Sequence, residues 1–184
     1  MIRRTLIPAL LLIASMQAFA QSRYFTKTGT INFTAGTPLE DIDAVNKSVT
    51  SVFDVNTGQI EFAVLIRGFE FRRALMQEHF NENYMESEKY PKSTFKGRFM
   101  DLSSINFKSD GTYPATVKGT LDIHNVKKEV EVPGTVKVSG GVISSTAVFK
   151  VEVADYQIEI PGAVRDKIAR TVEIRVSCEY KAKL

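Results

Sequence analysis

The sequence predicts an all-β protein: an antiparallel, up-and-down barrel of eight strands, with one or two short helices. Apolar and polar residues alternate along most of the chain, which is the pattern of strands with one buried face. Residues that tolerate a positive φ separate these runs at short intervals, as antiparallel hairpins require. One segment alone has the periodicity of a helix. A sheet of about eight such strands closes into a barrel.

The N-terminus has the three parts of a secretory signal peptide. Arg3 and Arg4 precede an apolar run that ends in an A-x-A cleavage site. We expect cleavage before about Gln21, which makes residues 1–20 a signal peptide and 21–184 a single domain. The mature protein is therefore expected in the periplasm or outside the cell.

The charge balance argues against several kinds of partner. Arg3 and Arg4 are the only charged residues of the leader, so its removal lowers the formal net charge from +3 to +1. Nucleic-acid binding needs a basic stripe and anionic membranes attract polybasic segments, and the mature sequence has neither. Its apolar runs are too short to cross a bilayer. We expect no nucleic-acid partner and no stable membrane insertion.

The first three strands are expected over 24–35, 43–56 and 58–71. The last of them has apolar residues on both of its faces. One face carries Ile60, Phe62, Val64 and Ile66, and the other carries Ala63, Leu65, Phe69 and Phe71. Because such a strand is buried on both sides, we expect the helix, or a second subunit of a homodimer, to cover the outside of the barrel there.

The helical segment spans about Arg72 to Met85. Acidic and amide side chains occupy one of its sides. The other side gathers Leu75, Met76, His79, Phe80 and Tyr84. We expect this helix to cap one end of the barrel and to flank the opening to its interior.

Five further strands follow the helix, each with alternating apolar and polar residues. They are expected over 93–108, 111–124, 127–139, 141–156 and 168–182. Hairpin turns are marked by Asp110-Gly111, His124-Asn125 and Gly140-Gly141. Only 36–42 and 157–167 are expected to form longer irregular connections.

Few side chains suggest chemistry beyond packing. Cys178, the only cysteine, shares the parity of buried residues, so we expect a buried thiol. By the same parity Arg170 points inward, where it needs a partner such as Asp155 or a ligand head group. His79 and His124 stand without metal-ligand spacing or a catalytic motif. We expect no metal, no cofactor and no enzymatic activity.

Two blocks of sequence carry a family resemblance. One is MQEHFNENYMESEKYPKSTFKG, from Met76 to Gly97, and the other is VKGTLDIHNVKKEVEVPG, from Val117 to Gly134. In their order and spacing they resemble the YceI family, which comprises exported or periplasmic bacterial proteins with a lipocalin-like barrel. The sequence departs from the family pattern at Asn125, where a glycine usually follows the histidine.

The resemblance implies a non-catalytic periplasmic protein that sequesters or carries a long amphiphilic lipid, such as an isoprenoid quinone or a polyisoprenoid. Exposing such a tail to water costs about 0.8 kcal/mol per methylene, so a dry barrel interior suits it. The alternative is a packed barrel that acts as a protein-interaction or stress-response module without a lipid. The candidate residues for cavity and mouth are Phe53, Phe62, Val64, Ile66, Phe69, Phe71, Leu75, Met76, His79, Phe80, Tyr84, Phe95, Phe99, Phe149 and Arg170.

Overall fold

A computed structural model describes residues 22–183 of the chain. The predicted signal peptide, residues 1–20, and the predicted first mature residue, Gln21, lie outside the described residues. Cleavage and export therefore stay predictions.

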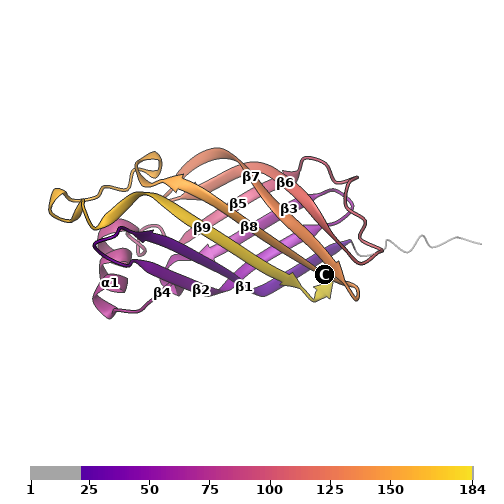
Figure 1. Cartoon of the computed structure of the whole chain (residues 1–184), viewed down its shortest axis with the longest axis horizontal. Coiled ribbons are helices and arrows are strands. Elements are labelled where there is room, and N and C mark those ends of the chain that lie inside the picture. The colour runs from indigo at the N-terminus through magenta and orange to yellow at the C-terminus, as the bar shows by residue number, and fades with distance from the viewer. Residues whose placement is uncertain (1–21, 184) are drawn as a thin grey trace, which may run out of the picture.

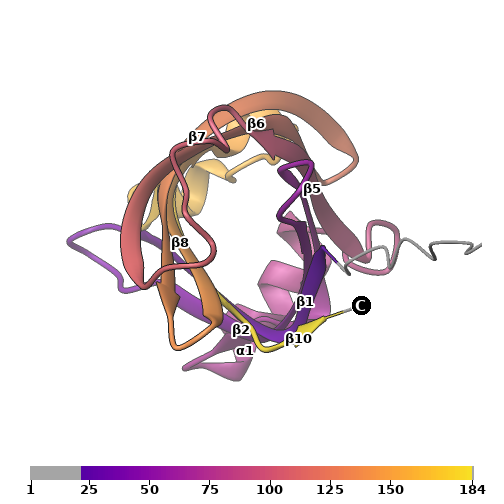
Figure 2. The same ribbon diagram turned by 90° about the vertical axis from the view of Figure 1, so that its right-hand side faces the viewer.

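Within the described residues, eight antiparallel strands close into one barrel, and each strand pairs with its neighbours in the sequence. The barrel closes because β1 pairs with both β2 and β9. Figure 2 shows the resulting ring of strands from one end. The predicted fold class is confirmed. The barrel strands are β1 (Arg23–Gly36), β2 (Asp43–Asp54), β3 (Gln59–Leu65), β5 (Lys92–Phe99), β6 (Gly111–Ile123), β7 (Val126–Ser139), β8 (Val142–Glu152) and β9 (Ile168–Tyr180).

Short elements complete the fold. Helix α1 (Ala74–His79) continues into a π-helical turn, η2 (Phe80–Tyr84), in which the Met85 N–H donates to the Phe80 carbonyl at 2.9 Å. This places a helix within the predicted segment, at one end of the barrel (Figure 1). The remaining elements are β4 (Glu70–Phe71), β10 (Ala182–Lys183) and the 3₁₀ turns η1 (Ile66–Gly68), η3 (Val153–Tyr156) and η4 (Gly162–Val164).

The segment 58–71 differs from its prediction. β3 ends at Leu65, whose carbonyl accepts a 2.9 Å hydrogen bond from the buried Asn46 amide, and the chain then turns through η1. This turn breaks the alternation, so Phe69 and Phe71 face the barrel interior. Ala63 and Leu65 are exposed. Within the single chain the outer face of β3 is therefore exposed, and the prediction that the helix covers it is wrong. Cover by a second subunit stays a prediction.

Two predicted strands are shorter than expected. β5 ends at Phe99 and β8 ends at Glu152, so residues 100–108 and 153–156 lie outside the sheet. Both segments still bury an apolar or aromatic residue, Ile105 in the first and Tyr156 in the second. Ile105 and Phe107 keep the parity of Phe99, and Val153 likewise continues the alternation of β8. The pattern therefore predicted both strands to be longer than they are.

The barrel is packed at the end opposite α1. Phe53, at the end of β2, lies 4.9 Å from Phe99, 5.6 Å from Phe107 and 6.0 Å from Tyr180, measured between ring centroids. The buried Tyr180 hydroxyl lies 2.9 Å from the Ser51 hydroxyl, so it keeps a hydrogen-bond partner. These aromatic rings close this end of the interior.

Cys178 lies in this packed region, with 2% of its surface exposed. The predicted buried thiol is confirmed. Burial raises its pKa to about 12, although a hydrogen bond with Tyr180 acts in the opposite direction. The unfolded thiol has a pKa of about 8.5, so the thiol favours the folded state below that pH, and this contribution is lost as the pH rises toward the folded value.

We expect the native Cys178 thiol to resist a thiol-specific reagent at about pH 8, because reaction requires an accessible thiolate. The denatured chain should react within the mixing time of the assay. Absorbance of the released chromophore measures both rates. Rapid, complete labelling of the native protein would show that this region opens readily.

Candidate functional site

The half of the barrel nearest α1 encloses an apolar cavity of about 480 Å³. A second cavity of about 110 Å³ adjoins it, toward the packed end. The two share wall residues Ile31, Val64 and Ile174. The interior is therefore hollow at the helix end and filled at the other, and the alternative of a barrel packed throughout is wrong.

Four phenylalanines attach the helical segment to the barrel wall. The Phe33 ring of β1 lies 5.2 Å from Phe69, 5.8 Å from Phe71 and 5.4 Å from Phe80, between ring centroids. Such pairs contribute about 0.5–1.5 kcal/mol each beyond the area that they bury. The cluster holds the π-helical turn over the cavity, so the helix forms its roof.

The structure brings most of the predicted site residues to the two cavities. The main cavity is lined by Val64, Ile66, Phe69, Phe71, Leu75, Met76, His79, Phe80 and Tyr84. The smaller cavity is lined by Phe62, Phe95, Phe99 and Phe149, and also by Val64. Strand parity and the helical stripe therefore located both the roof and part of the wall.

Two predicted site residues lie elsewhere. Phe53 belongs to the packed end of the barrel. Arg170 is exposed, although Ile168 and Val172 on either side of it line the main cavity. It lies in the stretch of β9 where the register with β1 is irregular, between the pairs Gly36–Ile168 and Thr34–Glu173. Asp155 instead lies 3.8 Å from the Lys128 ammonium. The predicted inward Arg170, with Asp155 as its partner, is wrong.

The rest of the lining was not predicted from the sequence. Much of the missing wall comes from β1, β8 and β9, where residues such as Phe33 and Val172 follow the period of two and could have been included. Glu40 and Lys167 lie in the connections 36–42 and 157–167, which carry no periodic signal. Only the folded chain brings these residues to the cavity.

Polar side chains are few in the main cavity. The Ser93 hydroxyl already donates a hydrogen bond to the Asp122 carbonyl at 2.6 Å, so its proton is not available to a ligand. Burial raises the pKa of the Tyr84 phenol, which therefore stays protonated and able to donate. The polar lining residues are Glu40, Arg73, His79, Tyr84, Ser93 and Lys167.

His124 lies outside this lining and connects two segments of the fold. Its Nε2 is 2.9 Å from a Glu86 carboxylate oxygen and its Nδ1 is 3.2 Å from the Tyr156 carbonyl. The Tyr90 ring packs edge-on against it, with centroids 4.6 Å apart. His124 thus ties the β6–β7 hairpin to the loop that follows the helix.

Residues 22–183 contain no group of three or more His, Cys, Asp or Glu side chains placed to hold a metal ion. None of the helices in that range combines the length and apolarity needed to span a membrane.

Several solved structures resemble this fold. A polyisoprenoid-binding domain from Saccharophagus degradans, implicated in plant cell wall breakdown, is 15% identical, with 88% of this chain and 99% of that one covered and a TM-score of 0.76. BcnA from Burkholderia cenocepacia is 15% identical, with coverages of 83% and 96% and a TM-score of 0.69. A YceI protein from Campylobacter jejuni is 17% identical, with coverages of 99% and 100% and a TM-score of 0.51.

No curated protein matches the chain significantly. At these identities the solved structures establish a shared fold. The family is established separately, because the sequence model of the YceI-like domain matches residues 17–180. The chain belongs to the YceI-like family.

Proposed function

We propose that this protein binds one long amphiphilic lipid of the isoprenoid class, holds its tail in the barrel and releases it unchanged. The observation that carries the proposal is the apolar cavity of about 480 Å³ beneath the helix. Its volume lies within the roughly 300–1,000 Å³ of typical ligand pockets. The smaller cavity continues the hollow toward the packed end, which suits a chain-like ligand.

The energetics favour a tail over a compact polar ligand. Each buried methylene contributes about 0.8 kcal/mol, so burying a ten-carbon segment contributes about 8 kcal/mol before the cost of ordering it. A polar ligand would find few partners among the lining residues. Among the similar structures, the Saccharophagus degradans domain is described as polyisoprenoid-binding, which supports the same ligand class here.

The proposed location is the periplasm or the cell exterior, reached by the predicted signal peptide. There the protein would sequester or carry an isoprenoid quinone or polyisoprenoid between membrane surfaces. A carrier is useful because the free tail is costly to expose to water, at about 0.8 kcal/mol per methylene.

The test uses the full chain with its leader, produced in a bacterial host and purified from the periplasmic fraction. Solvent extraction followed by mass spectrometry is expected to find a near-stoichiometric isoprenoid lipid. The intact mass of the protein is expected to correspond to a chain that begins at Gln21. Delipidated protein should then rebind a polyprenol or a quinone of similar tail length.

Repeated absence of any lipid, together with failure of the delipidated protein to bind either ligand, would overturn the proposal. An intact mass that includes residues 1–20 would overturn the proposed location but leave lipid binding standing.

A further inference from the structure

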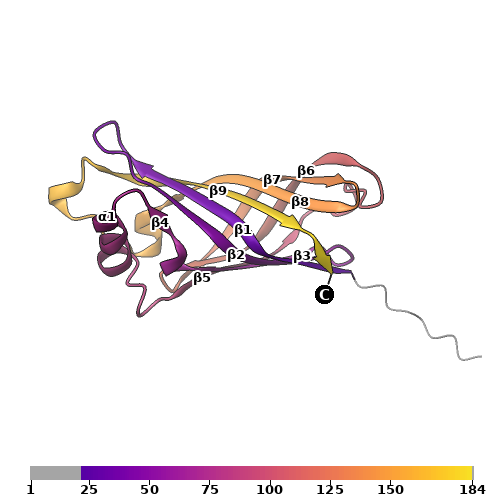
Figure 3. The ribbon, with the colours of Figure 1, turned by 90° about the horizontal axis from the view of Figure 1, so that it is seen from below.

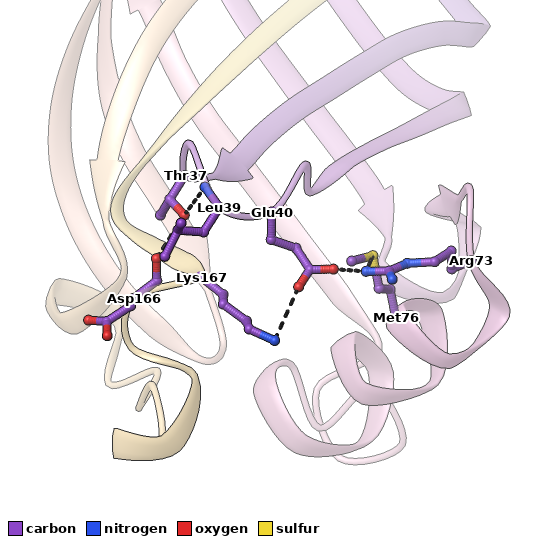
Figure 4. Close-up of polar contacts among 7 residues, drawn as sticks. All are labelled: Thr37, Leu39, Glu40, Arg73, Met76, Asp166 and Lys167. Carbon is purple, nitrogen blue, oxygen red and sulfur yellow. Dashed lines mark hydrogen bonds and ion pairs between the residues drawn. The ribbon is translucent and has the colours of Figure 1, made fainter.

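Three charged side chains from separate segments meet at the rim of the main cavity (Figure 4). Glu40 lies in the β1–β2 connection, Arg73 precedes α1 and Lys167 precedes β9. One Glu40 carboxylate oxygen pairs with the Arg73 guanidinium, and the other lies 3.6 Å from the Lys167 ammonium. The carboxylate therefore stands between two cations.

The three groups differ in exposure. The Glu40 side chain is 19% exposed, whereas Arg73 is 60% and Lys167 is 54% exposed. A guanidinium has five N–H donors and an ammonium has three, so most donors of both cations remain free for a ligand. These three side chains together carry one net positive charge.

Neighbouring contacts hold the rim in place. The Thr37 hydroxyl donates to the Asp166 carbonyl at 2.8 Å and accepts from the Leu39 N–H at 3.3 Å, so the two loops that carry Glu40 and Lys167 are joined. Figure 3 shows that these loops and α1 lie at the same end of the barrel. The loops that carry Glu40 and Lys167 are thus held together before a ligand binds, which reduces the ordering cost of binding.

We infer that this rim is a head-group site selective for an anionic, phosphate-bearing polyisoprenoid. The inference rests on the proposed function, because a tail that fills the cavity leaves its head group at the rim. Arg73 can bind two phosphate oxygens through its planar fork, and Lys167 adds a point charge. Glu40 keeps the cations in position in the empty site and competes with the phosphate for them. A neutral alcohol head group gains only hydrogen bonds there.

The experiment compares a polyprenyl monophosphate with the polyprenol of the same length, on delipidated protein. The dissociation constant of the polyprenol divided by that of the polyprenyl monophosphate reports head-group selectivity apart from tail binding. For the natural protein we expect this ratio to be at least ten. A tenfold preference for the phosphate corresponds to the contribution of about one charge-assisted hydrogen bond. The preference should shrink as salt is added, because the cations are exposed.

The variants are expected to change this ratio in opposite directions. Arg73→Gln and Lys167→Gln should each lower the ratio by about five- to tenfold, whereas Glu40→Gln should raise it because the competing carboxylate is gone. Arg170→Gln is the matched control, since Arg170 is exposed on β9 and does not line the cavity. Inorganic phosphate should not displace the lipid at equal concentration, because it has no tail to anchor it.

The possible failures are distinguishable. Equal affinity for the phosphate and the alcohol, or a ratio that falls in Glu40→Gln, would overturn the head-group assignment and leave tail binding intact. Effective displacement by inorganic phosphate would show a site for a free anion instead. Binding of neither lipid would overturn the proposed function, and this inference with it.

Discussion

Ala35→Phe is expected to weaken the binding of a polyprenyl tail by more than tenfold without unfolding the barrel. Ala35 is a small buried residue of β1 that lines the main cavity. A phenyl ring there occupies space that the tail would use. Displacing only two buried methylenes costs about 1.6 kcal/mol, which is already more than a factor of ten in affinity. Native mass spectrometry or displacement of a fluorescent lipid measures the dissociation constant.

Ala63→Phe is the control for this experiment. It makes the same substitution on an exposed residue of β3, outside the lining of both cavities. It should bind the tail as the natural protein does. Circular dichroism and thermal unfolding establish that both variants fold. A folded Ala35→Phe protein with undiminished affinity would show that the tail binds elsewhere.

Phe53→Ala is expected to lower the free energy of unfolding by about 3–5 kcal/mol, the usual cost of removing a buried aromatic side chain. Phe53 is 1% exposed and contacts three aromatic rings at the packed end. The loss is large against a typical total stability of about 5–15 kcal/mol. Denaturant titration followed by circular dichroism measures it.

Phe71→Ala is the matched comparison for Phe53→Ala. Phe71 is only partly buried and lines a cavity that already exists, so its removal deletes fewer contacts. We expect it to cost less than half as much as Phe53→Ala. Equal losses for the two variants would contradict the division of the barrel into a packed end and a hollow end.

The barrel strands, their antiparallel order and the helical roof could all be predicted from the residues alone. These follow from local rules, because alternation sets the face of each strand residue and turn residues set the hairpins. The stripe of Leu75, Met76 and Phe80 likewise placed the helix over the interior. Two blocks of sequence also indicated the family.

Which inward residues pack together and which line a cavity could be seen only in the folded barrel. Phe53 and Phe62 share the same inward pattern, yet the first fills the packed end and the second lines a hollow. Alternation assigns a face, whereas free volume depends on every side chain that the closed barrel brings together. Glu40 and Lys167 lie in irregular connections, which have no period, so the sequence could not place them beside Arg73. Only closure of the barrel brings the three residues into contact.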